Sequence, residues 1–587
     1  MSKKKLIGII AVVVVASIII AIIARPTPAS TPKYTLSVSV SPPRAGSVSP
    51  SGGKYLRGVQ VALTATPATG YRFANWTGDV GTVADVNSAS AVISMNEDYS
   101  ITANFAEETI EILDWYDLDA VRDSLDASYL LMNDLDSSSA GYTELASEIA
   151  NGGRGWEPIG TSDYGFTGSF NGQGYEIRDL FIDRPGQSYV GLFGHISWIH
   201  PAENVGAIEN VGVVNAHVTG ANRVGVLVGD NAGIVNNSYS TCSVTRGAEY
   251  VGGLVGYDDG GSVTNAYSTG NVTANRYVGG LVGRITGTQT VREGTVRNCY
   301  SASSVTGFVR VGGLVGSTFA DVDVDNSYFA GSVNGTRWVA GLVAENYGGN
   351  VSNSYSIGSV IADTGYVGGL VGFNLWGNIS RCYSTGTVNG EAPVGGMVGD
   401  NSEGTVIDCY STGSVTGFTR TGGLVGNIVA DGNVSGSYFA GSVNGTRWVA
   451  GLVAENYGGT VSNCYSTGDV TGRDYSGYVG GVVGFNLWGN ISKCYSTGTV
   501  NGEAPVGGLV GDSSEGPVNH SLWDIQTSGQ NTSDGGTGKT TTEMKNIATF
   551  TGAGWNIVAV ANPDITNPSY IWNIVDGQTY PFLSWQL

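Results

Sequence analysis

The stretch VGGLVG at Val251–Gly256 is one copy of a phrase that returns at a nearly constant interval along the chain. Most successive copies begin 27 or 28 residues apart. A fixed period of about 20–50 residues is the signature of a repeat architecture, in which each unit contacts its neighbours. The copies begin at Val190, Val224, Val251, Val278, Val311, Val339, Val367, Val394, Thr421, Val449, Val479 and Val506.

A second phrase follows in each unit, for example GGTVSNCYSTGDVTG at Gly458–Gly472. Each unit therefore consists of short β runs separated by Gly and Asn turns, with no helical period. The predicted fold is all-β: a parallel β-helix of about twelve 27–28-residue repeats, with one repeat forming each coil.

Aligning the copies with one another predicts which side chains face inward. The Val or Ile of the second phrase never changes type, which predicts a buried ladder. Two residues later the chain accepts Arg381 and Lys493, so that position is exposed, and the next residue is always small. A turn or bulge must interrupt the alternation of faces between the ladder and the exposed position. Tyr comes next in ten consecutive units and should stack at about 4.8 Å per coil: Tyr239, Tyr267, Tyr300, Tyr328, Tyr355, Tyr383, Tyr410, Tyr438, Tyr465 and Tyr495.

The N-terminus predicts a membrane anchor over residues 1–25. Three lysines, Lys3 to Lys5, precede an uncharged apolar run from Leu6 to Ala24. Nineteen residues at about 1.5 Å each span about 28 Å, close to the thickness of the hydrocarbon layer. The lysines should stay in the cytoplasm, which places the rest of the chain outside the cell. The alternative is a cleaved signal peptide and a secreted protein.

Residues 26–33 form a Pro/Ser/Thr linker, and residues 34–107 alternate apolar and polar residues as in a small β domain. Its stretch GSVSPSGGKY at 46–55 resembles the divergent internalin-type B-repeat domains of surface proteins. The repeats at 190–516 resemble the GLUG-motif family, named for the phrase seen at Gly253–Gly256. Residues 108–189 and 517–587 then serve as the N-terminal and C-terminal caps. This resemblance implies location at the cell surface and adhesive or structural roles.

The net charge of −21, with only 28 Lys and Arg, repels phosphate backbones, so no nucleic-acid partner is expected. The four histidines, His195, His200, His217 and His520, show no metal-binding spacing. His195 and His200 are expected in a solvated loop, and His217 is expected in the tyrosine position of its unit. No cofactor is expected.

The six cysteines leave two alternatives open. Five of them, all except Cys242, share the small inward position, where Ser and Ala also occur. Cys382 and Cys409 lie in adjacent coils, as do Cys464 and Cys494, at a spacing that a disulfide could bridge. Buried free thiols and axial disulfides are therefore both compatible with the sequence.

Acidic residues cluster in turns. Asp321, Asp323 and Asp325 could form a Ca²⁺ site, although no GGxGxD calcium repeat supports it. Asp400 with Glu403 and Asp512 with Glu515 recur at matching positions, which indicates solvated faces rather than the paired carboxyls of a glycosidase.

The candidate ligand-contact residues are four tryptophans in Gly-rich turns, Trp338, Trp376, Trp448 and Trp488. A partly duplicated block, seen in the repeated stretches 327–349/437–459 and 373–380/485–492, places them in pairs four coils, or about 19 Å, apart. Evenly spaced aromatic side chains suit an extended polymer. The predicted function is therefore non-catalytic adhesion or binding of a polysaccharide or protein ligand. A structural stalk or envelope protein is the nearest alternative, and a polysaccharide-active enzyme is a distant one.

Overall fold

Each repeat forms one coil of a parallel β-helix in the computed structural model, which describes residues 32–68, 70–198, 205–287, 294–473, 477–503 and 505–586. The chain divides into two units, Met1–Thr109 and Ile110–Leu587. The predicted membrane segment at 1–25 lies outside the described residues. Within them, no helix is both long and apolar enough to cross a bilayer.

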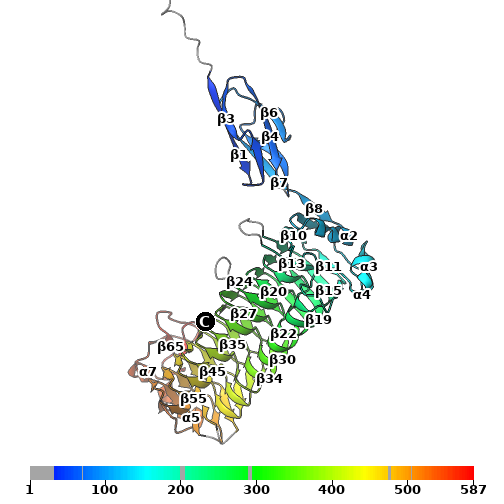
Figure 1. The fold of residues 1–587 in the computed structure, drawn as a ribbon. Helices are drawn as coiled ribbons and strands as arrows, with labels where there is room; N and C mark the ends of the chain where they lie inside the picture. The colour runs from blue at the N-terminus through cyan, green and yellow to red at the C-terminus, as the bar shows by residue number, and fades with distance from the viewer. Residues whose placement is uncertain are drawn as a thin grey trace, which may run out of the picture. The chain divides into compact units, whose positions relative to one another are not determined.

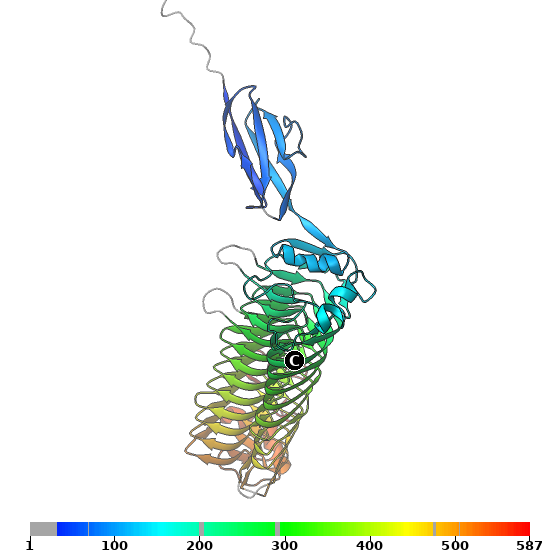
Figure 2. The same ribbon diagram turned by 45° about the vertical axis from the view of Figure 1, so that its right-hand side comes forward.

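One coil passes through three sheets in turn. In a typical coil, β30 (Ser332–Ala340) belongs to a 29-stranded sheet, β31 (Val343–Tyr347) to a 12-stranded sheet and β32 (Asn350–Ser352) to a 15-stranded sheet. The chain then returns to the 29-stranded sheet at β33 (Tyr355–Ser356). Equivalent residues of adjacent coils pair in parallel, for example Val343 with Val371. Figures 1 and 2 show the stacked coils.

The 12-stranded sheet contains one strand from each copy of the six-residue phrase, which gives eleven steps from the first coil to the last (12 − 1) and confirms the predicted repeat. Its strands are β13 (Phe193–Ile196), β17 (Val228–Asn231), β20 (Val255–Asp259), β23 (Val282–Thr286), β27 (Val315–Phe319), β31, β35 (Val371–Leu375), β40 (Val398–Ser402), β45 (Val425–Val429), β50 (Val453–Tyr457), β55 (Val483–Leu487) and β60 (Val510–Ser514).

The two other sheets of the solenoid run along the same coils as the 12-stranded sheet. The 29-stranded sheet extends from β11 (Glu176–Arg178) to β63 (Thr537–Lys539). The 15-stranded sheet consists of β8 (Thr109–Ile112), β9 (Ser128–Leu131), β10 (Ser169–Asn171), β14 (Ala207–Glu209), β18 (Ile234–Asn236), β21 (Ser262–Thr264), β24 (Gly294–Arg297), β28 (Val322–Asp325), β32, β36 (Asn378–Ser380), β41 (Thr405–Ile407), β46 (Asn433–Ser435), β51 (Thr460–Ser462), β56 (Asn490–Ser492) and β61 (Val518–Asn519).

The glycines of the six-residue phrase allow close contact between coils. A Cβ on Gly252 would lie 2.0 Å from the carbonyl oxygen of Val255, and one on Gly253 would lie 2.2 Å from that of Gly280 in the next coil. Both distances are far below van der Waals contact, so glycine is favoured where the chain bends from one sheet to the next, although Ala340 and Ala450 occupy the Gly252 position in their coils.

One residue in the left-handed conformation interrupts the alternation of inward and outward side chains between the Val/Ile ladder and the small inward position. Asn237, Asn265 and Asn298 have φ values of 47°, 51° and 54°, and Arg381 and Lys493 adopt the same conformation at 53°. One such residue bends the chain at the corner, so the buried Val before it and the buried small residue after it both face inward. Asn adopts this region more readily than most residues, which explains why it predominates there.

The tyrosine ladder forms as predicted. The ten rings lie 4.7–5.0 Å apart, centroid to centroid, with interplanar angles of 10° or less. Because each ring stacks on the next, the ring faces within the ladder are already occupied by protein. The tyrosine ladder therefore stabilises the coils and offers a ligand only ring edges and hydroxyl groups.

A polar ladder runs through the interior beside the 12-stranded sheet. Asn346 Nδ2 donates to Asn374 Oδ1 at 2.8 Å, and Asn374 Nδ2 donates to Asn401 Oδ1 at 2.7 Å. Asp258 occupies the equivalent position in its coil, fully buried, and accepts from Asn231 Nδ2 at 2.7 Å. These bonds satisfy polar groups that would otherwise be costly to bury.

Caps cover both ends of the solenoid. The N-terminal cap contains α2 (Trp115–Asp119), the 3-10 helix η1 (Ala120–Asp123), α3 (Tyr142–Leu145) and α4 (Ala150–Gly153). The C-terminal cap contains α5 (Ile525–Ser528), α6 (Thr541–Met544), α7 (Ile547–Gly552), β64 (Ile557–Ala559), β65 (Trp572–Ile574) and β66 (Phe582–Leu583). This cap also folds back along the tyrosine ladder, where Trp585 Nε1 donates to the Gly436 carbonyl at 2.9 Å. Covered ends are expected in a solenoid, because exposed strand edges promote aggregation.

The N-terminal unit contains two small sheets with strand orders β3-β1-β7-β5 and β2-β4-β6. Its core includes Trp76, Ile93 and Ile101, all buried. The strands are β1 (Lys33–Ser41), β2 (Gly46–Ser49), β3 (Gly52–Leu56), β4 (Gln60–Pro67), β5 (Tyr71–Gly78), β6 (Ser90–Ser94) and β7 (Tyr99–Glu107).

All six cysteines are buried free thiols in the structure. The Cys409 thiol donates to the Ile407 carbonyl, with the sulfur 3.1 Å from the oxygen. Burial raises the pKa of the Cys409 thiol well above its usual value, with the neighbouring Cys382 contributing. Of the two alternatives that the sequence leaves open, the structure contains the free thiols.

Candidate functional site

The outer surface of the 12-stranded sheet and its two corners, here called the aromatic face, carries two clusters of aromatic side chains. In cluster 1, the rings of Tyr366 and Phe373 lie 4.9 Å apart, and Trp338 stacks on both at 6.0 and 6.1 Å. At the opposite corner, Trp376 packs edge-on against Tyr347 at 5.1 Å. Cluster 1 thus consists of Trp338, Tyr347, Tyr366, Phe373 and Trp376.

Cluster 2 repeats this arrangement four coils later. Trp448 and Tyr478 stack on Phe485 at 6.1 and 5.3 Å, and Trp488 packs against Tyr457 at 5.2 Å. At about 4.8 Å per coil the two clusters lie about 19 Å apart along the solenoid. The structure therefore brings all four predicted tryptophans to one face, as two matching pairs. Cluster 2 consists of Trp448, Tyr457, Tyr478, Phe485 and Trp488.

Trp376 and Trp488 combine exposure with an unfavourable backbone conformation. Their side chains are 50% and 53% exposed, and their φ values are 57° and 58°. A left-handed conformation costs a residue with a Cβ about 1–2 kcal/mol. The preceding coils place Gly348 and Gly458 at this position. Ala320, Glu403 and Glu515 adopt the same conformation at this corner of other coils, so the two tryptophans are distinguished by their large exposed rings and not by the backbone.

Trp338 and Trp448 are more deeply packed than the other pair. Each is half-buried at the other corner of the sheet. Each also comes directly after an arginine in the sequence, Arg337 or Arg447. The Arg310 guanidinium lies 4.0 Å from the Trp338 ring centroid, and the Arg420 guanidinium lies 4.8 Å from that of Trp448. Arg310 in turn pairs with Glu345 at 2.6 Å. These two tryptophans therefore form the base of each cluster, beside positive charge.

Sequence reasoning missed six members of the two clusters. The signal lay in two columns that flank the six-residue phrase: the residue just before it and the residue just after it. The first column contains Tyr366 and Tyr478, and the second contains Phe373 and Phe485. Tyr347 and Tyr457 each follow the second column by two residues.

A carboxylate between the clusters corrects one expectation. Asp400 was expected on a solvated face, yet it is 2% exposed and accepts from Asn427 Nδ2 at 2.7 Å. Burial raises the pKa of Asp400 despite this bond. Its partner in the sequence motif, Glu403, is exposed at the left-handed corner as expected.

The three aspartates considered for Ca²⁺ do not converge. Asp325 accepts from Ser352 Oγ and Asn353 Nδ2, both at 2.7 Å, and Asp323 accepts from Asn350 Nδ2 at 3.0 Å. Across the ranges that the structure describes, no group of three or more His, Cys, Asp or Glu side chains could hold a metal ion. The Asp323 and Asp325 carboxylates instead bond to the next coil.

Two histidine expectations were wrong. His195 lies on β13 rather than in a solvated loop, with Nδ1 3.3 Å from Asp230 Oδ2. His217 does not take the tyrosine position, because Gly212 pairs with Tyr239 while His217 pairs with Ser243. His520 is exposed at the left-handed corner, and His200 lies outside the described residues.

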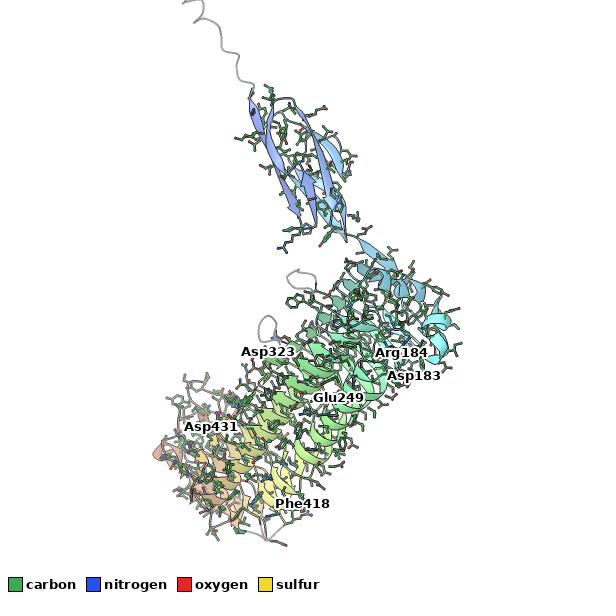
Figure 3. The ribbon with its side chains drawn as sticks, viewed as in Figure 1. Asp183, Arg184, Glu249, Asp323, Phe418 and Asp431 are labelled. Atoms are coloured by element: carbon green, nitrogen blue, oxygen red, sulfur yellow. The ribbon has the colours of Figure 1, made fainter. Side chains whose placement is uncertain are left out.

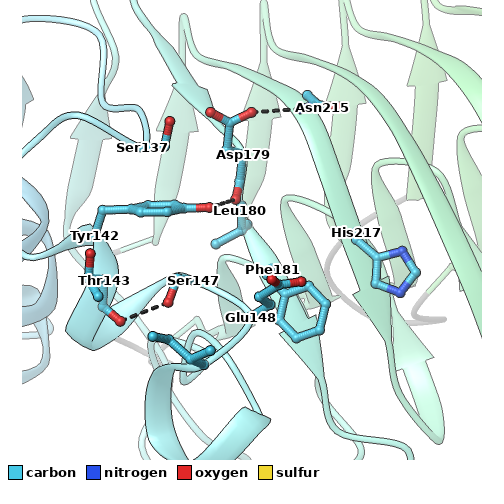
Figure 4. A pocket seen from close by; sticks show the side chains of 11 residues that line it. Ser137, Tyr142, Thr143, Ser147, Glu148, Asp179, Leu180, Phe181, Asn215 and His217 are labelled. Carbon is cyan, nitrogen blue, oxygen red and sulfur yellow. Dashed lines mark hydrogen bonds between the residues drawn. The ribbon is translucent and has the colours of Figure 1, made fainter.

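A separate cavity of about 560 Å³ lies where the N-terminal cap meets the first coils. Figure 4 shows its polar groups bonded to one another: Asn215 Nδ2 donates to Asp179 Oδ1 at 2.6 Å, and Tyr142 Oη donates to the Asp179 carbonyl at 3.0 Å. The Phe181 and His217 rings stack at 5.5 Å. We assign this cavity to packing of the cap.

The stacked coils with an aromatic outer face define this chain as a repeat protein of the β-solenoid class. Two known family models match parts of it. Residues 36–109 match the divergent InlB B-repeat domain. The GLUG motif matches residues 247–273, 274–306, 363–389, 449–471 and 475–501. The chain thus contains one B-repeat domain followed by GLUG repeats, as the sequence resemblance predicted.

Two relatives match part of the chain. Halomucin of Haloquadratum walsbyi is 39% identical over 145 residues, which cover 24% of this chain and 2% of halomucin. A candidate Gly-rich membrane protein of Evansella cellulosilytica is 38% identical over 125 residues, which cover 20% of this chain and 13% of the relative. This chain therefore matches only a small part of either relative.

A solved structure also aligns with the chain. It is a candidate immunoglobulin A1 protease from Bacteroides ovatus, aligned over 82% of this chain and 93% of the other at 17% identity. The TM-score is 0.18, so this alignment carries no argument about fold or function.

Proposed function

We propose that this protein is a non-catalytic surface solenoid, anchored by its N-terminal apolar run, that binds an extended polysaccharide on the aromatic face. One observation carries the proposal: the same cluster occurs twice on one face, and each copy contains a large exposed tryptophan.

The proposed location has two supports. Lys3 to Lys5 and the apolar run from Leu6 to Ala24 have the order and length of an anchor with the remaining chain outside the cell. In addition, one of the two relatives is named as a membrane protein.

The proposed ligand class follows from the shape and chemistry of the clusters. Exposed aromatic rings bind the apolar faces of sugar rings because both surfaces leave water on contact. Two equal clusters about 19 Å apart on one rigid frame favour a ligand that is long enough to contact both. A compact ligand would use only one of them.

The carboxylates of the face support binding without cleavage. Glycoside hydrolysis uses two carboxyl groups that flank the bond to be broken. Here Glu345 pairs with Arg310, Glu455 pairs with Arg420, and Asp400 accepts from Asn427. These three acids are each held by a partner on the protein itself, whereas Glu403 at the corner is exposed.

The test combines binding and cleavage in one experiment. The full chain, kept in mild non-ionic detergent, is run through native gels containing neutral or acidic polysaccharides, and the same polymers are assayed for new reducing ends. We expect retardation by at least one polymer and no reducing ends. Reducing ends would indicate an enzyme, whereas no retardation by any polymer would favour a structural stalk.

A further inference from the structure

A cationic cavity adjoins cluster 1 in this strongly acidic protein. It has a volume of about 520 Å³ and lies at the corner where the 29-stranded sheet meets the aromatic face. Three arginines and two aromatic side chains contribute to its wall. The lining residues are Asn275, Arg276, Phe308, Val309, Arg310, Arg337 and Trp338.

The arginines come from three consecutive coils: β22 (Tyr267–Gly279), β26 (Ser304–Gly312) and β30. In the strand register, Arg276 pairs with Val309, and Val309 pairs with Arg337. Arg276 and Arg337 therefore lie in one column, two coils or about 10 Å apart. Arg310 occupies the next position, over the ring of Trp338.

The three guanidinium groups differ in how they are neutralised. Arg310 is 16% exposed and paired with Glu345, whereas Arg276 is 43% exposed and pairs with Glu249 at 2.8 Å. Arg337 is exposed and forms no ion pair within the described parts of the chain. Three guanidinium groups and no carboxylate therefore line the cavity, while Asp363 lies on the next coil, where it accepts from Thr336 Oγ1 at 3.2 Å.

We propose that this corner cavity binds a carboxylate or sulfate group of an acidic polysaccharide whose neighbouring sugars lie on cluster 1. The inference rests on the proposed function and narrows its ligand class. A guanidinium donates two parallel N–H bonds to a carboxylate or sulfate, and Trp338 provides an apolar surface beside that anion. Arg337 and the exposed side of Arg276 supply the donors.

The duplicated block provides a less cationic counterpart. Counted from the six-residue phrase, Phe418, Arg420, Arg447 and Trp448 repeat Phe308, Arg310, Arg337 and Trp338. The position of Arg276, however, is occupied by Ala392, and that of Asn275 by Glu391. The anionic subsite is therefore assigned to the cluster 1 corner and not to its counterpart.

The experiment uses a full-length double variant that carries both Arg276→Gln and Arg337→Gln. Its affinity is compared with that of the unchanged protein. Affinity gels contain polygalacturonate, dextran sulfate or uncharged dextran, so that carboxylate, sulfate and neutral ligands are separated. Arg381→Asn is the matched control, since it removes an exposed arginine on another corner where Asn occupies most coils.

We expect the double variant to lose at least tenfold in affinity for one or both acidic polymers, with dextran unaffected and the control unchanged. Equal losses in the control would overturn the inference, because a general charge effect would then explain them. If the unchanged protein binds dextran and the double variant binds every polymer equally well, the anionic subsite is overturned. The proposed function would then remain intact. Absence of binding to every polymer would overturn both.

Discussion

Replacing both Trp376 and Trp488 by glycine is expected to weaken polysaccharide binding by about 30-fold or more without destabilising the fold. Two aromatic contacts of at least about 1 kcal/mol each would be lost. Glycine relieves the left-handed backbone of both corners, and it already occupies this position at Gly348 and Gly458. Loss of the half-buried indole contacts, including the Trp488 Nε1 hydrogen bond to Glu515 Oε2 at 2.6 Å, offsets this relief of about 1–2 kcal/mol per corner, so the free energy of unfolding should change by no more than about 1 kcal/mol in either direction.

Affinity gels and thermal unfolding of the same preparations check both halves of this prediction. Phe418→Ala is the matched control, because Phe418 is 57% exposed at the solenoid surface but belongs to neither cluster (Figure 3). If the glycine variant unfolds several degrees earlier yet still binds, the tryptophans stabilise the coils and do not contact a ligand.

The second large effect concerns the pH dependence of stability. Burial raises the pKa of Asp258 to about 8, from 3.8 for the free side chain. Because its folded-state pKa is raised, Asp258 favours folding most below pH about 4, and this contribution is lost as the pH rises towards 8. Asp258→Asn removes the titrating group, and Asn already occupies the equivalent position at Asn346 and Asn374.

We therefore expect Asp258→Asn to raise the free energy of unfolding on the order of a few kcal/mol at neutral to mildly alkaline pH. The gain should shrink towards zero near pH 4. Denaturant unfolding at several pH values measures it, with the exposed Asp431→Asn as control (Figure 3). A gain that does not vary with pH would mean that Asp258 is not buried in its acid form.

Repetition made the core predictable. The small inward position and the stacking tyrosines could be identified because consecutive coils repeat the same side-chain type, Tyr in ten of them. The left-handed corner could not be assigned in advance, because Asn, Arg and Lys all occur there and none is specific for that conformation. Only the need for a turn was visible in the sequence.

The site was predictable in part. Exposed tryptophans in Gly-rich turns were recognisable, but their partners were not, since Phe373 and Trp338 meet only when two adjacent coils stack. The expectation for Asp400 failed for a related reason: a turn-like sequence motif does not reveal which of its residues the coil buries. Contacts such as Trp585 with Gly436 join residues far apart in sequence and follow no repeat.

The most direct test of the account measures affinity against the length of the oligosaccharide. A paired aromatic site should bind short oligomers weakly and show a sharp gain once a chain can span the distance of about 19 Å between Trp376 and Trp488. That gain should disappear when either tryptophan alone is replaced by glycine. Affinity that rises smoothly with length, or is unchanged in both single variants, would contradict a paired aromatic site.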